Sequence, residues 1–150
     1  RRMMYVAKDE EGDVRLSRAR YVYDLRANQY LGHVDRFTTQ KFGNRATFLV
    51  LSDVALNAPV VTTAGGKWQL GQTESVDLSF PGSDATHAVR LEVFLPDHTH
   101  AEWLNQVILV PPGGFKTDLR IAHNDPEGDW TLRARDLYTG EVVETKVSVR

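Results

Sequence analysis

The sequence predicts an all-β protein, with an Ig-like or fibronectin-like antiparallel β-sandwich preceded by the strands of a second, small β-module. Apolar and polar residues alternate along most of the chain, and β-branched and aromatic residues are frequent in the alternating segments. Turn residues interrupt this alternation at short intervals. With 150 residues, of which 41% are hydrophobic, the chain can bury a core as one domain or as two small modules.

Residues 1–56 are predicted to form a partial or small β-module. An alternating hairpin is followed by extended chain and by a short apolar strand that can be buried on both of its faces. The chain begins with two arginines, and residues 4–7 already have the pattern of a strand, so we interpret it as a fragment whose first sheet starts upstream. The expected segments are a strand over 20–25, a turn over 26–29, a strand over 30–34, extended chain over 35–40 and the apolar strand over 46–51.

Residues 57–66 are predicted to be a linker. They contain Pro59 and the pair Gly65 and Gly66, and hydrophobic periodicity is weakest in this stretch. We therefore expect the sandwich to occupy residues 67–150.

The sandwich is predicted to have about seven strands, the number typical of Ig-like and fibronectin-like domains. Trp130, Leu132 and Ala134 share one face of the strand over 130–136, and polar residues occupy the other face, as a strand with one solvated face requires. One short helical turn is expected over 99–105. The expected strands are 68–70, 75–80, 88–95, 107–110, 115–121, 130–136 and 142–149.

Composition and charge argue against several classes of partner and site. The 20 acidic and 18 basic residues are interspersed and give a net charge of -2, so no nucleic-acid partner is expected. Cysteine is absent, which excludes disulfides and thiolate chemistry in this chain but leaves the compartment open. No stretch approaches about 18 consecutive apolar residues, so neither membrane insertion nor an export signal is expected. No cofactor is predicted.

The densest group of potential metal ligands lies in the connection between two expected strands. His98 and His100 would point to one side of an extended segment, and Glu102 could join them to bind zinc. The alternative is that all three are solvated loop residues, because no fourth ligand is evident. We favour this alternative and predict no metal site, with His98, His100 and Glu102 as the weak candidates.

No catalytic residue is predicted. Ser83 lacks the surroundings of a strained nucleophile elbow and is interpreted as a turn residue. His123 and Asp125 could act as a base and the group that orients it, but residues 124–128 are a strong turn signature. The acidic run over 9–13 is interpreted as an exposed hairpin tip, while a carboxylate pair remains open because its separation is a three-dimensional quantity.

Trp103 is the weak candidate for a ligand or partner contact. It lies in a connection, and aromatic residues in such positions often mark interfaces or stack on sugar rings. Trp130 occupies a core-facing strand position and is predicted to be structural.

Two motifs resemble a known group of proteins. Residues 21–35, YVYDLRANQYLGHVD, resemble the pattern yvYDlrtgkyLGkvd of β-sandwich regions near the C-termini of large bacterial proteins related to glycoside hydrolases of the β-galactosidase superfamily, and the similarity extends to residues 46–51. Residues 124–132 and 135–140 are similar to the ending NDPxGxWtLrvrDlxTG of Ig-like domains in those proteins, and also in macroglobulin-type and bacterial surface proteins. These motifs identify a fold better than a function.

The resemblance implies a non-catalytic accessory region of a larger carbohydrate-processing protein, which packs on or spaces a catalytic domain encoded elsewhere. Its partners would be other domains of the same polypeptide, with carbohydrate as a further candidate, and a secreted or periplasmic location is favoured. The alternative is a glycan- or protein-binding adhesion module of a bacterial surface protein, in which residues 97–105 recognise the ligand. A stand-alone enzyme is the third hypothesis.

Overall fold

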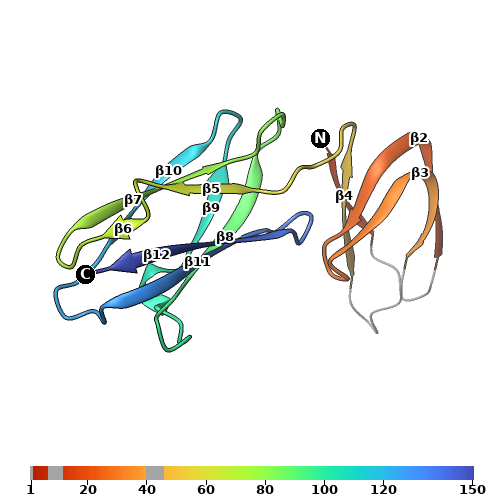
Figure 1. Cartoon of the computed structure of the whole chain (residues 1–150). Coiled ribbons are helices and arrows are strands. Elements are labelled where there is room, and N and C mark those ends of the chain that lie inside the picture. Colours follow the sequence, from red (N-terminus) through yellow and green to blue (C-terminus); the bar gives the residue numbers. More distant parts are fainter. Residues whose placement is uncertain (1, 7–11, 40–45) are drawn as a thin grey trace. The chain divides into compact units, whose positions relative to one another are not determined.

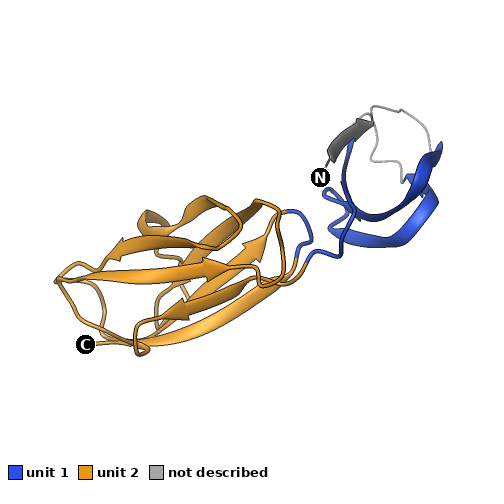
Figure 2. Ribbon diagram, turned by 90° about the horizontal axis from the view of Figure 1, so that it is seen from above, with its two compact units in different colours: residues 1–56, 138–140 blue, residues 57–137, 141–150 orange. Residues whose placement is uncertain are grey.

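The computed structural model describes residues 2–6, 12–39 and 46–150, with side chains for the last two ranges (Figure 1). The described elements are strands and one short 3-10 helix, which confirms the predicted all-β class. The chain divides into two compact units, which comprise Arg1–Leu56 with Tyr138–Gly140, and Asn57–Leu137 with Glu141–Arg150 (Figure 2). We call them unit 1 and unit 2. In the described ranges, no helix has the length and apolar character needed to cross a membrane.

Unit 1 contains a four-stranded sheet in the order β1-β4-β2-β3. The hairpin predicted from the alternation is formed by its two longest strands, and Asp24 Oδ1 closes the turn by accepting hydrogen bonds from the backbone N–H groups of Arg26 and Ala27, each at 2.9 Å. Its strands are β1 (Arg2–Val6), β2 (Gly12–Asp24), β3 (Gln29–Thr39) and β4 (Thr47–Ser52).

The central strand β4 is covered on both faces, as its apolar sequence predicts. Leu49 packs in a cluster on one face and Val50 in a cluster on the other, because successive side chains of a strand point to opposite faces. Both residues are almost fully buried, at 0% and 1% exposed.

Unit 2 is an Ig-like sandwich of two sheets, with strand orders β10-β7-β5 and β6-β12-β11-β8-β9. All strand pairs are antiparallel except β6 with β12, which are parallel. The helical turn expected over 99–105 is the 3-10 helix η1 (Glu102–Leu104). The strands are β5 (Val60–Thr63), β6 (Lys67–Trp68), β7 (Thr73–Ser79), β8 (His87–Phe94), β9 (Gln106–Val110), β10 (Phe115–Arg120), β11 (Gly128–Asp136) and β12 (Val142–Val149).

The segment predicted to be a linker, residues 57–66, contains strand β5. Val61 is buried (7% exposed), and four consecutive β-branched residues suit the pairing of β5 with β7. Gly65 and Gly66 follow with φ values of 73° and 65°, which are accessible to glycine. The glycine pair therefore marks the point where the chain passes from the three-stranded sheet to the five-stranded sheet.

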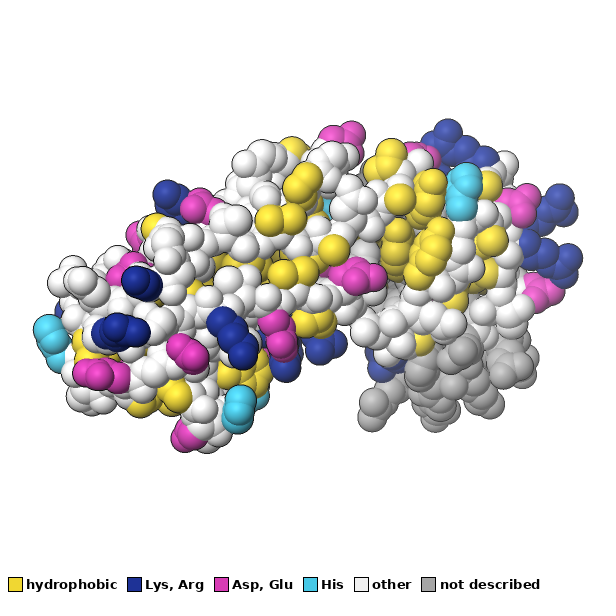
Figure 3. Space-filling view, in the orientation of Figure 1, with side chains coloured by type: hydrophobic (Ala, Val, Ile, Leu, Met, Phe, Trp, Pro, Cys, Tyr) yellow, Lys and Arg dark blue, Asp and Glu magenta, His cyan; other side chains and the backbone are white. Residues whose placement is uncertain are grey.

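The core of unit 2 lies between the two sheets. Trp130, Leu132 and Ala134 of β11 are all 0% exposed, so the face predicted to be internal is internal. Trp68 of β6 is buried beside this set at 1% exposed, and Trp130 Nε1 donates a hydrogen bond to the Pro126 carbonyl at 2.9 Å. On the visible face of unit 2, acidic and basic side chains are interspersed (Figure 3).

The two glycines in the turn between β9 and β10 differ in the space available for a side chain. Both have left-handed backbones, with φ of 93° at Gly113 and 94° at Gly114, but a Cβ at Gly114 would lie 2.9 Å from the Leu78 carbonyl oxygen, whereas a Cβ at Gly113 would meet nothing within 4 Å. We expect Gly114→Ala to lower the free energy of unfolding by about 2 kcal/mol and the control Gly113→Ala by about 1 kcal/mol, as measured by urea denaturation. Equal losses for both variants would contradict the backbone clash.

Candidate functional site

Three side chains of unit 2 form a hydrogen-bonded relay near the start of β8 and the end of β11. His87 Nδ1 lies 3.1 Å from Asp136 Oδ2, and His87 Nε2 lies 2.9 Å from Ser83 Oγ. The His87 and Asp136 side chains are fully buried, and Phe80 stacks on the imidazole with 3.7 Å between ring centroids. In the neutral ring, Nδ1–H donates to the carboxylate and Nε2 accepts from the serine hydroxyl.

The relay has the connectivity of a Ser-His-Asp triad, but its surroundings favour a structural role. Catalysis of acyl transfer needs free donors beside the serine to hold an oxyanion. Here Ala85 N–H donates to Ser83 Oγ itself at 3.2 Å, and Ser83 N–H donates to the Phe80 carbonyl at 3.0 Å. We therefore infer that the relay holds the turn over residues 80–85 against β8 and β11.

Sequence reasoning placed Ser83 in a turn, where the structure also has it, but it did not connect this residue with a base. His87 and Asp136 are 49 positions apart in the sequence. Each sits at one end of an alternating strand, and the only sequence signal was a polar residue at an otherwise core-facing position.

The metal-ligand candidates lie in the exposed connection between β8 and β9, but the structure does not gather them. No group of three or more His, Cys, Asp or Glu side chains suited to a metal ion occurs among the described residues, which include all three candidates. His98 has a left-handed φ of 65°, so the extended alternation that would align it with His100 is broken. The His100 ring instead lies 4.2 Å from the Phe94 ring, and Glu102 begins η1.

Asp97 accounts for the shape of this connection. Its Oδ1 accepts hydrogen bonds from Thr99 Oγ1 at 2.6 Å and from Thr99 N–H at 3.0 Å. The hydroxyl hydrogen bond, followed by the backbone one, lowers the pKa of Asp97 below its ordinary value. Because the pKa of Asp97 is lower in the folded chain than in the unfolded chain, its carboxylate stabilises this turn at pH values above the unfolded pKa. That contribution is lost as the pH falls through the folded pKa.

Each of the other candidate residues that the structure describes has its own surroundings. Trp103, in η1, is 61% exposed and remains a predicted contact residue. Asp125 Oδ2 accepts a hydrogen bond from Ala122 N–H at 2.7 Å, which gives it a role in the turn that follows β10. Of the acidic run, residues 9–11 lie outside the described residues, and Asp13 in β2 pairs with Arg36 at 2.6 Å.

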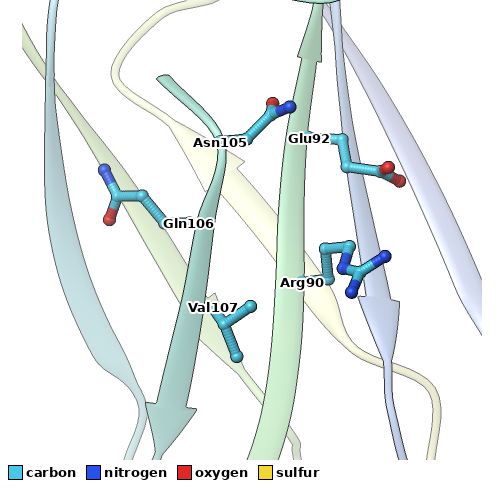
Figure 4. A pocket seen from close by; sticks show the side chains of 5 residues that line it. All are labelled: Arg90, Glu92, Asn105, Gln106 and Val107. Atoms are coloured by element: carbon cyan, nitrogen blue, oxygen red, sulfur yellow. The ribbon is translucent and has the colours of Figure 1, made fainter. Parts of the chain in front are cut away.

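The most exposed apolar surface of unit 2 lies on β9, the last strand of the five-stranded sheet. Val107 and Leu109 are each 63% exposed, more than any other large hydrophobic residue among those described. We call these two residues the β9 edge. Beside them is an open depression of about 260 Å³ lined by Arg90, Glu92, Asn105, Gln106 and Val107 (Figure 4).

The chain matches solved structures, whereas no family model and no curated protein matches it. The native conformation of E. coli alpha-2-macroglobulin, reconstructed by cryo-EM, matches with a TM-score of 0.49 and 14% identity over 93% of this chain and 10% of that chain. The crystal structure of a point mutant of Salmonella alpha-2-macroglobulin matches with a TM-score of 0.47 and 16% identity over 94% of this chain and 11% of that chain.

These matches correct the relationship predicted from the sequence motifs. Both of these structures are alpha-2-macroglobulins and neither is a glycoside hydrolase, so the predicted resemblance to proteins of the β-galactosidase superfamily is wrong, as are the accessory role in carbohydrate processing and the adhesion alternative. The physical reason is that residues 124–132 and 135–140 form the turns and strand of the last hairpin, which a sandwich needs whatever it binds. In three dimensions the chain is similar to a portion of two alpha-2-macroglobulins that makes up about a tenth of each.

Proposed function

We propose that this chain is a non-catalytic structural module of a longer polypeptide, in which unit 2 packs against a neighbouring domain. The β9 edge is the observation that carries the proposal. Val107 and Leu109 are each 63% exposed, and covering them with a partner would contribute about 1–2 kcal/mol each from burial of apolar surface.

The polar groups in the interior of unit 2 support a structural rather than a chemical role. The relay from Ser83 to Asp136 is used to hold a turn, and its two buried members are closed off from solvent. The depression beside the β9 edge is open, whereas an enzyme site normally encloses most of its ligand. This depression is therefore better suited to contact with a protein than to turnover of a small molecule.

Hydrogen exchange tests this proposal on the full gene product and on the 150-residue chain in parallel. We expect the amides of Val107 and Leu109 to exchange about tenfold or more slowly in the full product, because a packed neighbour would cover them. The amides of the exposed Lys116 and Asp118 on β10 serve as the control and should exchange equally in both samples. Equal exchange at the β9 edge in both samples, or a full product consisting of this chain alone, would sink the proposal.

A further inference from the structure

The direction of the backbone groups of β8 shows which side of β9 is free. In an antiparallel sheet, the N–H and C=O of one residue point to the same side, and successive residues alternate. Val93 points toward the β9 side, because its N–H donates to Asn105 Oδ1 and its carbonyl accepts from Ala101 N–H. Ala88 points the other way, because its carbonyl accepts from Leu137 N–H after β11. The odd-numbered residues of β8 therefore make the hydrogen bonds to β9.

The residues of β9 with free backbone groups are Val107 and Leu109. The odd-numbered residues of β8 are paired with Gln106, Ile108 and Val110, so the two residues between them direct their N–H and C=O groups away from β8. Within the described part of the chain, neither residue makes a backbone hydrogen bond outside the β8–β9 ladder. The β9 edge thus combines free backbone donors and acceptors with exposed apolar side chains.

The β9 edge lacks the features by which proteins protect an edge strand from pairing. Its sequence, QVILV, contains no charged residue, proline or glycine. The edge strand β10 of the other sheet, FKTDLR, differs in carrying exposed Lys116, Asp118 and Arg120. The remaining edge strands of unit 2, β5 and β6, are only four and two residues long. The β9 edge is therefore the surface of unit 2 best suited to pair with an added strand.

Two arginines beside this edge indicate the charge of the partner. Like charges directly opposite each other in a sheet are destabilising, yet Arg90 and Arg135 are cross-strand neighbours, and neither forms an ion pair within the described residues. Arg133 differs because it pairs with Glu144 at 2.8 Å. One row on the outer face of the sheet holds, from β12 to β9, Val142, Arg135, Arg90 and Val107.

The position of Arg90 also predicts the register of the partner. Neighbouring strands lie about 4.8 Å apart, so a residue added opposite Val107 would lie about 10 Å from the Arg90 Cα, within the combined reach of an arginine and a glutamate side chain. Glu92 faces the same side one row away and would repel a carboxylate placed there (Figure 4). The next position on the same face of the added strand would lie opposite Leu109. Leu109 itself pairs with Ala88, so an apolar residue suits this position.

We propose that the β9 edge binds an extended acidic segment of a neighbouring domain as an added strand, with a carboxylate opposite Val107 paired to Arg90 and an apolar side chain opposite Leu109. The inference rests on the proposed function and specifies the chemistry of the contact. Main-chain hydrogen bonds from Val107 and Leu109 supply affinity, and Arg90 supplies the preference for acid.

The test uses the whole 150-residue chain and two acetylated eight-residue peptides. Both peptides have threonine at every second position, and the positions between, which share one face of an extended strand, alternate between valine and glutamate in one peptide and between valine and lysine in the other. In NMR titrations at low salt, the glutamate peptide should shift the amides of Val107 and Leu109 and bind about tenfold more tightly than the lysine peptide. Arg90→Gln should reduce this preference to about threefold or less. Arg120→Gln, which removes an exposed arginine from β10, is the matched control and should leave the preference unchanged.

Equal affinity for the two peptides, or shifts centred away from β9, would overturn the inference. So would concentration-dependent dimers in sedimentation velocity with broadened β9 amides, because the edge would then take a second copy of this chain. If the β9 edge is protected in the full gene product but shows no preference for glutamate, the proposed function holds and this inference fails. If glutamate is preferred but the edge stays unprotected in the full product, the proposed function fails, and with it the neighbouring domain as the source of the strand, while the preference of the edge for an acidic strand stands.

Discussion

Replacing Asp136 with alanine should lower the free energy of unfolding of unit 2 by about 3 kcal/mol. The carboxylate is 0% exposed and lies 3.1 Å from His87 Nδ1, so its removal leaves a buried imidazole N–H without this acceptor. The three tryptophans of the chain, Trp68, Trp103 and Trp130, all belong to unit 2, so tryptophan fluorescence during urea unfolding reports on this unit specifically.

Two variants of the relay serve as controls for this prediction. Asp136→Asn keeps an oxygen that can accept from His87 and should cost less than alanine. Ser83→Ala removes the half-buried end of the relay and should cost about 1 kcal/mol. A loss below about 1 kcal/mol for Asp136→Ala would show that the relay does not hold the sandwich together.

Replacing Trp130 with alanine should cost about 3–5 kcal/mol, because it removes the largest kind of side chain from a fully buried site and leaves a cavity between the sheets. The substitution also deletes the hydrogen bond from Nε1 to the Pro126 carbonyl. Urea unfolding, followed through the two remaining tryptophans, measures the loss.

Trp103→Ala is the matched control for this substitution. Its side chain is 61% exposed, so the same change in chemistry should alter the free energy of unfolding by no more than about 0.5 kcal/mol. Similar losses for the two variants would contradict the division between core and surface tryptophans.

Most strands of the sandwich could be predicted because their signal is local. Strands β7, β8, β10 and β11 alternate with a period of two, β9 is a short apolar run, and turn residues separate the strands. The structure places all the strands from β7 to β12 within a few residues of the predicted ranges. Strand β5 was not predicted, because Pro59 and the pair Gly65 and Gly66 surround it with residues that also occur in linkers. Only its pairing with β7 makes this short segment a strand.

The candidate sites depended on contacts that the sequence does not contain. The alignment of His98 with His100 assumed an extended backbone, and the left-handed φ at His98, together with the Asx turn at Asp97, changes that backbone. The relay joins His87 to Asp136 across the two strands β8 and β11, which are far apart in the sequence.

The sequence by itself determined the all-β class, the strands β7 to β12 of the sandwich and the inward face of β11, because alternation and turn chemistry act between neighbouring residues. Tertiary structure decided which strand became the exposed edge, which polar residues met in the relay, and which arginines were left without a carboxylate. Those features depend on the order of strands in a sheet and on the register between them, which arise from packing between distant segments.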